Sequence, residues 1–272
     1  MNWRAIKAIV RKDLKVVSQN KGVLIPMIVV PLVIMVALPA ATALIPLFEQ
    51  DLSSSFAEID SFLQGMPGGL RAGIAGYNEG QTLIVLLLVY FFAPMYLILP
   101  LMVSSVIAAD SFAGEKERKT LEALLYTPTT DGELFLAKLI SAWLPALVVA
   151  WGGFLLYALV ANVAAWPTMG RIFFPNLMWG FLALWVAPAA AGLGLGATVL
   201  ISVRAQGFQD AYQLGAIVVL PIIVLVIGQA MGVMYFSVGL VVLLGLVLWA
   251  LDAVLLWFGA RTFKRSELAS RL

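Results

Sequence analysis

The chain contains six apolar runs that are each long enough to cross a lipid bilayer. They cover approximately residues 23–47, 83–109, 134–160, 177–201, 211–231 and 233–260. A helix needs about 20 apolar residues to cross the roughly 30 Å hydrocarbon core, because each residue advances it by about 1.5 Å. The runs therefore predict an all-α integral membrane protein with six transmembrane helices.

The composition excludes several classes of chemistry. Of the 272 residues, 62% are hydrophobic and only 12% are charged, whereas soluble domains carry about 25% charged residues. The absence of cysteine excludes disulfides and thiolate metal sites, and the absence of histidine excludes HExxH metalloproteases. Because paired intramembrane carboxylates and a GxSxG motif are also missing, the sequence does not predict an enzyme.

Lysine and arginine are concentrated on one predicted side of the membrane. All but two of the 17 basic residues fall in the N-terminal arm, the middle loop, the loop after the fourth span and the C-terminal tail. Arg71 and Arg171 fall on the other side. Cytoplasmic loops carry an excess of Lys and Arg, so the pattern predicts a multi-pass protein with both termini in the cytoplasm.

Residues 1–22 predict an amphipathic helix at the cytoplasmic membrane interface. An apolar stripe recurs at three- and four-residue steps, and most of the cations fall elsewhere on the helix; its members are Trp3, Ile6, Val10, Leu14 and Val17. Two roles remain open for this helix. It could only anchor and orient the first span, or it could also contact a cytoplasmic partner.

The longest polar segment, residues 48–82, is predicted to be external. Phe56, Ile59, Phe62 and Leu63 recur at helical spacing and predict a short amphipathic helix. The Gly-rich stretch PGGLRAGIAGYNEG that follows predicts irregular structure. Further along, the close spacing of the last two spans leaves two possibilities, a tight helical hairpin or a span followed by a re-entrant piece near residues 228–232.

The middle loop, residues 110–133, has a strong local pattern. From Glu115 to Tyr126 nearly every residue favours a helix, and Glu115 could pair with Arg118 and Lys119 at helical spacing. Pro128 cannot continue that helix, and residues 130–133 match a capping box that starts the next one. The loop therefore predicts a rigid helix, a turn and a new helix.

A partner could dock on this rigid element. Leu121, Leu124 and Leu125 form a small apolar face surrounded by charges of both signs. Leucines of this kind can be buried in a partner's groove while the charges set the register. The alternative is a solvated hairpin that only connects two spans.

Residues 114–128, GEKERKTLEALLYTP, resemble the loop motif of ABC-2 type permeases, the membrane subunits of ABC exporters. The family pattern, (R/G)E-x-E-R-x-T-L-E-x-L-L-x-T-P, more often has glycine at the position of Lys119. Lys138 resembles a lysine that follows this motif in the family. The likeness extends to SVRAQGFQDAYQLGAIVVLPIIVL and to the basic tail GARTFKRSELASRL, and it spans nearly the whole chain.

This resemblance implies a half-transporter of a prokaryotic inner membrane. It would pair with a second permease, identical or a paralogue, and with two ATPase subunits that bind ATP and Mg²⁺. No cofactor in this chain and no nucleic acid are expected. The family's coupling helix, which lies between spans 2 and 3 and docks on the ATPase, would correspond to Gly114, Glu115, Glu117, Arg118, Thr120, Leu121, Glu122, Leu124, Leu125, Thr127 and Pro128.

The residues themselves agree that the energy source lies elsewhere. The sequence has no GxxxxGK[ST], so it has no P-loop to hold ATP phosphates. The remaining sources are an ATPase partner or an ion gradient. A gradient-driven secondary transporter generally has several intramembrane ionisable residues and repeated, broken helices. One intramembrane acid and no visible repeat favour the ATP-driven permease.

Asp252 is the only carboxylate well inside a predicted span. Such a residue is a functional candidate by default, here for a substrate, ion or gating role. It could instead be structural, paired with Arg204 or a glutamine, protonated, or in reach of cytoplasmic water. Gly192 and Gly196 form a GxxxG that permits close helix packing within the chain or at a dimer contact. Apolar spans rich in Trp, Phe, Met and Leu favour a hydrophobic or amphipathic substrate, and export follows from the resemblance alone.

Overall fold

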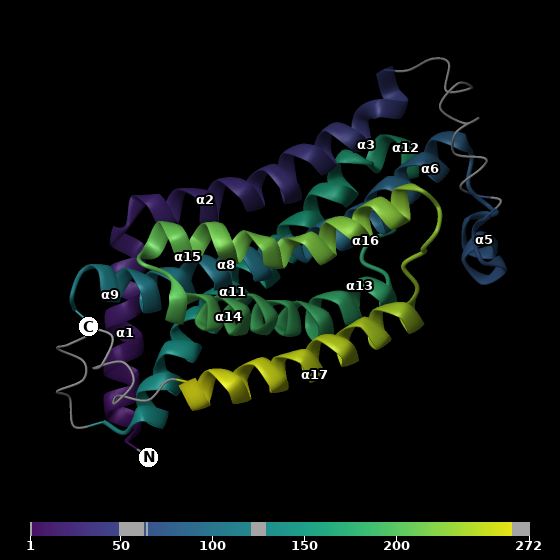
Figure 1. Cartoon of the computed structure of the whole chain (residues 1–272). Helices are drawn as coiled ribbons and strands as arrows, with labels where there is room; N and C mark the ends of the chain where they lie inside the picture. The colour runs from purple at the N-terminus through teal and green to yellow at the C-terminus, as the bar shows by residue number, and fades with distance from the viewer. Residues whose placement is uncertain (1, 49–62, 64, 121–128, 263–272) are drawn as a thin grey trace.

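The computed structural model describes residues 2–48, 63, 65–120 and 129–262 (Figure 1). Within this part, six helical spans are long and apolar enough to cross a membrane: Lys21–Phe48, Glu79–Glu117, Asp131–Ala164, Leu177–Arg204, Phe208–Ala230 and Val238–Arg261. The described residues contain no β-strand. The prediction of an all-α membrane protein with six spans is confirmed.

Most spans combine several helical segments. The first consists of α2 (Lys21–Leu32), η1 (Val33–Ala37) and α3 (Leu38–Phe48). The second consists of α6 (Glu79–Ile84), η2 (Val85–Phe91), α7 (Phe92–Tyr96), α8 (Ile98–Ala109), η3 (Asp110–Gly114) and α9 (Glu115–Glu117). The third span is α11 (Asp131–Ala164), and the sixth is α17 (Val238–Thr262). The fourth consists of α13 (Leu177–Phe181), η4 (Leu182–Val186) and α14 (Ala187–Arg204). The fifth consists of α15 (Phe208–Gly215), η5 (Ala216–Val219) and α16 (Leu220–Ala230).

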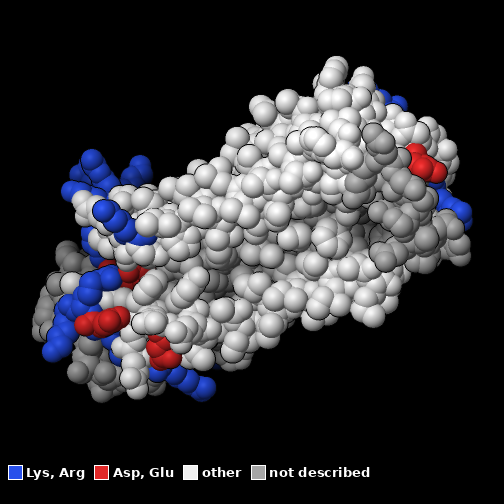
Figure 2. Space-filling view, turned by 90° about the horizontal axis from the view of Figure 1, so that it is seen from above, with Lys and Arg blue, Asp and Glu red and all other residues white. Residues whose placement is uncertain are grey.

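The spans run side by side from one end of the bundle to the other (Figure 1). One end carries α1 (Trp3–Gln19), which crosses the bundle, together with α9 and the C-terminal ends of α14 and α17. The opposite end carries α5 (Gly68–Ile74), α6 and α12 (Trp166–Met169). On the face shown in Figure 2, the charged side chains lie at these two ends, with an uncharged surface between them. Many exposed large hydrophobic residues belong to the spans, among them Leu155, Leu184 and Val224. A bilayer requires this distribution of polar and apolar surface.

The second and fourth spans form the core of the bundle. In their most apolar windows 78% and 72% of the residues are buried, against at most 33% in the other four spans. Within the fourth span, α14 packs against α8, α11, α15 and α17. Alanine and glycine make this possible, because small residues let the helix backbones approach closely.

Three spans widen into a π-helical turn shortly before a proline: η1 before Pro39, η2 before Pro94 and η4 before Pro188. A proline cannot donate a hydrogen bond to the carbonyl four residues earlier, so the regular ladder must change there. In η2, the Leu88 carbonyl accepts a hydrogen bond from Tyr157 Oη at 2.5 Å, and the Val89 carbonyl accepts one from Trp179 Nε1 at 2.7 Å. These side chains supply hydrogen bonds that lipid cannot supply.

The external segment differs from its prediction at one place. The Gly-rich stretch was expected to be irregular, but it contains α5 (Gly68–Ile74). Leu70 and Ile74 lie four residues apart and both pack into the apolar core, which stabilises one helical face. The amphipathic helix expected at Phe56, Ile59 and Phe62 lies outside the described residues.

The last two spans form a helical hairpin. α16 ends at Ala230, and the connection turns at Gly232, which has a left-handed φ of 68°. Figure 1 shows α16 and α17 each extending along the bundle, with this turn at the end where α5 and α6 lie. The structure therefore favours the hairpin over a re-entrant piece.

The packing of α14 against α8 gives a stability prediction for Gly194→Ala. A Cβ at residue 194 would lie 2.5 Å from the Leu101 carbonyl oxygen and 2.6 Å from Ser104 Oγ. The helices must separate to accommodate it, so we expect the free energy of unfolding to fall by about 1–3 kcal/mol in a denaturant titration of the purified protein. Gly152→Ala in α11 is the control, since nothing lies within 4 Å of its Cβ. An equal loss in both variants would contradict the close packing.

Candidate functional site

The charged middle stretch begins on the end of the second span. The helix does not stop at the predicted boundary near Ala109 but continues through η3 and α9 to Glu117. Here it meets α11 and α1, which packs across the first turns of α11. Three elements far apart in the sequence thus converge at one end of the bundle.

The N-terminal helix forms as predicted, but its buried face is different. The buried residues are Ile6, Ile9, Asp13 and Val17, whereas Trp3 of the predicted stripe is 54% exposed. This face of the helix points inward because Ser111 of η3 and Ser141 of α11 donate hydrogen bonds to the Asp13 carboxylate. Arg4, Lys7, Arg11 and Lys15 remain on the outer face.

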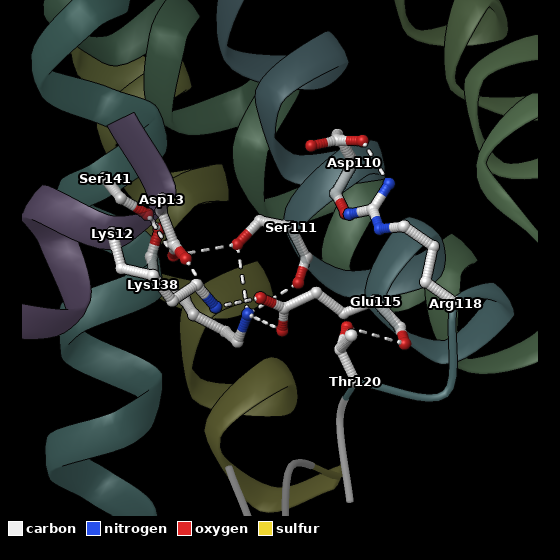
Figure 3. A network of polar contacts seen from close by, with 9 residues as sticks. All are labelled: Lys12, Asp13, Asp110, Ser111, Glu115, Arg118, Thr120, Lys138 and Ser141. Atoms are coloured by element: carbon white, nitrogen blue, oxygen red, sulfur yellow. Dashed lines mark hydrogen bonds and ion pairs between the residues drawn. The ribbon is translucent and has the colours of Figure 1, made fainter. Parts of the chain in front are cut away.

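Lys138 of α11 is completely buried and is the centre of a polar network (Figure 3). Its Nζ atom donates to Glu115 Oε2 at 2.5 Å, to the Ser111 carbonyl at 2.5 Å and to Ser111 Oγ at 3.1 Å. It also lies 5.3 Å from the centre of the Phe112 ring. An ammonium group has three protons to donate, so these three acceptors satisfy it without water.

α1 completes the network with one charge of each sign. Lys12 Nζ donates to Glu115 Oε1 and lies 3.0 Å from Asp13 Oδ1. Asp13 Oδ2 accepts hydrogen bonds from Ser111 Oγ at 3.2 Å and Ser141 Oγ at 3.1 Å. Two cations and two carboxylates therefore share one cluster with no net charge, in which Lys138, Glu115 and Asp13 are buried and Lys12 is partly exposed. The opposite charges offset the cost of desolvating the buried groups.

The charge state of Lys12 follows from this cluster. Burial by itself lowers the pKa of Lys12, but the hydrogen bond and charge of Glu115, together with Asp13, outweigh burial and raise the pKa above its ordinary value. Lys12 therefore remains an ammonium ion at neutral pH. Its bond to Glu115 holds α1 against the end of the second span.

An ion pair outside the network fixes the turn that follows α9. Arg118 Nη1 donates to Asp110 Oδ1 at 2.9 Å, and Nη2 donates to the Asp110 carbonyl at 3.3 Å. A Cβ at Gly114 would lie 3.1 Å from both Asp110 Oδ1 and Arg118 Nη1, so glycine leaves the space that this pair occupies. Asn20, between α1 and α2, also donates to Asp110 Oδ1 at 3.4 Å.

Lys116 and Glu117, which lie between Glu115 and Arg118, contact the loop between the fourth and fifth spans. Lys116 Nζ donates to the Ala205 carbonyl at 3.2 Å, directly after α14. Glu117 Oε2 accepts a hydrogen bond from the Phe208 backbone N–H at 2.8 Å, at the N-terminus of α15. A carboxylate is favoured at a helix N-terminus. Any Cβ at Gly207 would overlap the Glu117 side chain, so this approach requires glycine there.

The predicted helix from Glu115 to Tyr126 is wrong over residues 118–120. α9 ends at Glu117, and Lys119 has a left-handed φ of 56°. The Thr120 N–H donates to the Glu115 carbonyl at 3.0 Å and the Lys119 N–H donates to the Lys116 carbonyl at 3.1 Å, which is the Schellman pattern of a helix end. The expected pairs of Glu115 with Arg118 and Lys119 do not form, because Glu115 binds Lys12 and Lys138 instead.

The helix after the loop begins as predicted. Thr130 and Glu133 form the capping box at the start of α11, with Glu133 N–H donating to Thr130 Oγ1 at 3.3 Å and Thr130 N–H donating to Glu133 Oε2 at 3.1 Å. Glu133 Oε1 also accepts a hydrogen bond from the Asn2 N–H at 2.6 Å. The start of α1 is therefore attached to the start of α11.

The predicted coupling residues divide into two groups. Gly114, Glu115, Glu117, Arg118 and Thr120 lie in the described contacts. The other predicted coupling residues lie outside the described residues: Leu121, Glu122, Leu124, Leu125, Thr127 and Pro128. The contact of this loop with a partner stays a prediction.

Sequence reasoning did not identify most of the network's partners. It noted Lys138 only by resemblance and did not select Lys12, Asp13, Ser111 or Ser141. One signal was present: Asp13 lies four residues after Ile9 and four before Val17, so an acid occupies a position on the buried stripe. Within the described part of the chain, no group of three metal-ligating side chains is found.

Asp252 lies in α17, away from this network. It is 2% exposed, and neither carboxylate oxygen has a hydrogen-bond partner in the described part of the chain. Of the alternatives left open for Asp252, pairing with Arg204 or a glutamine is not seen among the described residues. Gly192 and Gly196 of α14 face Asp252 and Leu255 of α17, so this GxxxG packs within the chain.

A family model described as "ABC-2 family transporter protein" matches residues 7–255. The matched range contains the whole polar network and Asp252. No curated protein and no solved structure matches the chain.

Removing Lys138 should destabilise the protein strongly. Lys138→Met leaves Glu115 buried with only half of its charge partners, and breaking a buried pair in this way costs about 3–5 kcal/mol. Thermal or denaturant unfolding measures the loss. Glu115→Gln in the same chain should recover part of it by removing the unpaired charge. Lys7→Met on the exposed face of α1 is the control and should shift stability by less than about 0.5 kcal/mol. A Lys138→Met variant as stable as Lys7→Met would contradict the network.

The helix end at Lys119 gives a prediction of the opposite sign. Lys119→Gly should raise the free energy of unfolding by up to about 1 kcal/mol, since the left-handed conformation costs an L-residue roughly 1–2 kcal/mol and glycine little. Lys119→Ala keeps the Cβ and removes the charge, so it should give no such gain. Equal effects of glycine and alanine would show that charge, not conformation, is responsible.

Proposed function

The chain belongs to the ABC-2 family of transporter proteins, and we propose that it is the permease subunit of an ATP-driven exporter of hydrophobic or amphipathic substrates. Membership makes the chain a transmembrane subunit of an ABC transporter and implies an ABC ATPase as its partner. Export, the substrate class and coupling through residues 114–128 are the proposed refinements. The chain has no P-loop of its own, so the partner would bind ATP and Mg²⁺ and hydrolyse the nucleotide.

The proposal rests mainly on the contacts of residues 115–118, where the middle loop joins the second span. Each of these four side chains is bound within the chain: Glu115 to α1 and α11, Lys116 to the end of α14, Glu117 to the start of α15 and Arg118 to Asp110. A loop that only connected two spans would not require four successive charges held in this way. A loop that receives force from a partner requires a firm attachment to the spans that must move.

The attachment suggests how an ATPase could act on the membrane domain. An ATPase that moves residues 121–128 would displace α9, and the network would carry α1 and the first turns of α11 with it. The bonds of Lys116 and Glu117 would transmit the same displacement to the α14–α15 connection. Coupling of this kind needs packed elements with more than one arrangement, and buried ion pairs and helix caps provide discrete contacts.

The distribution of charge supports the proposed orientation. In the described residues, the end with α1 and α9 carries most of the cations, whereas Arg71 lies in α5 and Arg171 follows α12, both at the opposite end (Figure 1). By the positive-inside rule, we assign the α1 end to the cytoplasm of a prokaryotic inner membrane, where an ATPase can reach it. A second permease, identical or a paralogue, would complete a transporter with two ATPases.

An apolar groove supports the proposed substrate class. It has a volume of about 420 Å³ and lies between α13–η4 and α17. Its lining is Leu177, Gly180, Phe181, Leu184, Trp185 and Val242. Such a surface suits an acyl chain or another apolar group better than a sugar or a free ion.

The coupling proposal predicts a loss of regulation when the loop's leucines are changed. In the reconstituted transporter, Leu121→Ser with Leu124→Ser should reduce substrate-stimulated ATP hydrolysis at least tenfold, because the apolar docking face is lost. Insertion into the membrane should be unchanged. Ile172→Ser, an equally polar change at an exposed site at the opposite end, is the control.

Two results would contradict this proposal. Normal coupling after residues 121–128 are replaced by a Gly/Ser linker would exclude the loop as the coupling element. Substrate uptake into vesicles driven by a proton or sodium gradient, without ATP or an ATPase, would favour a secondary transporter instead.

A further inference from the structure

The buried carboxylate of Asp252 has no role in the proposed coupling. It occupies the contact line between α14 and α17, which pack against each other along their lengths. On the N-terminal side of Asp252 in α17, a Cβ at Gly245 would overlap the ring of Trp185 in η4. Trp249 Nε1 donates to the Trp185 carbonyl at 3.3 Å. On the C-terminal side of Asp252, a Cβ at Gly196 of α14 would lie 3.0 Å from Leu255 Cβ of α17. Asp252 is therefore an ionisable side chain in a helix seam otherwise made of glycine, tryptophan and leucine.

Gly192 gives this carboxyl group its space. Any Cβ at residue 192 would overlap the Asp252 carboxylate, so the group lies directly on the backbone of α14. Among the residues that the structure describes, neither Oδ1 nor Oδ2 has a hydrogen-bond partner, and the side chain is 2% exposed. An ionised carboxylate without partner or water is strongly disfavoured inside a membrane.

No cation on the described elements around the seam forms an ion pair with Asp252. The only charged residue of α14 is Arg204, which is exposed and lies twelve residues from Gly192, about 18 Å along the helix axis. Arg261 of α17 lies over the Trp257 ring at 3.6 Å. α13 and η4, which also pack on α17, contain no ionisable residue. Lys138 of α11 is bound to Glu115 and Ser111.

The space around the carboxyl group limits what it can bind. Two grooves involve α17: one lies between η4 and α17 and is lined by Leu184, Trp185 and Val242, and the other is lined by Leu200, Arg204 and Phe258. Asp252 lines neither of them. A substrate ammonium group or a hydrated metal ion could not reach it without separation of the helices, whereas a proton could.

We propose that Asp252 is a proton-binding site whose occupancy controls the packing of α14 against α17. With the proton bound, the neutral acid fits against Gly192 in the packed seam. When the proton is transferred to water, the resulting carboxylate needs hydration, and Gly192 leaves no space for water. Deprotonation therefore separates α14 from α17 at Asp252. This device is independent of the ATPase and of the loop at residues 121–128.

Infrared spectroscopy of the full chain in lipid nanodiscs tests the protonation state. We expect a carbonyl band of a protonated carboxylic acid at neutral pH that disappears in Asp252→Asn and shifts in Asp252→Glu. The matched control is Asp210→Asn, because Asp210 is an exposed acid on α15. Absence of the band from the wild-type protein, or its persistence in Asp252→Asn, would overturn the proposal.

Spin labels test the link between the proton and the packing. The chain has no native cysteine, so Val203→Cys in α14 and Phe258→Cys in α17, which line one groove, can be labelled without background. Raising the pH should lengthen or broaden the distance between the labels in the wild-type background and leave it unchanged in Asp252→Asn, which mimics the protonated state. The same pH response in both backgrounds would overturn the proposal. So would a change caused by sodium or an organic cation at constant pH, because the site would then bind a larger ion.

Discussion

The buried bond between Lys138 and Glu115 is the interaction on which this end of the molecule depends. Neither charge could lie there alone, because the desolvation of an isolated ion exceeds what packing returns. Lys12 and Asp13 supply the second pair, and Ser111 and Ser141 supply the remaining hydrogen bonds. The need to neutralise one buried ammonium group thus positions α1, the end of the second span and the start of α11 relative to one another.

The apolar part of the bundle is subject to the same requirement, that buried polar groups have partners within the protein. Lipid offers no hydrogen bonds, so backbone groups in the spans need partners within the protein, and an ionised side chain there needs one even more. The backbone carbonyls of Leu88 and Val89 receive theirs from Tyr157 and Trp179. Asp252 receives none among the described residues, and this contrast is the reason for assigning it a proton.

The sequence predicts the features that depend on local or periodic patterns. Six apolar runs predict the six spans, and Thr130 with Glu133 predicts the helix start that the structure contains. The helix end at Lys119 was not predicted, because the partners of Glu115 lie 103 and 23 residues away and override the local helix preference. The buried face of α1 was misplaced for a similar reason, since Asp13 looks like a surface residue until Ser111 and Ser141 are beside it. The family's usual glycine at position 119 has a physical explanation in the left-handed backbone there.

The central claim is that the network makes α1, α9 and α11 one mechanical unit. The most direct measurement is the distance between spin labels at Lys7→Cys in α1 and Leu144→Cys in α11, in the complete transporter with its ATPase, with and without bound ATP. The account predicts that this distance stays constant through the nucleotide cycle. It also predicts that the distance varies once Lys138→Met removes the connection. A change of several ångströms in the transporter with Lys138 intact would contradict the account.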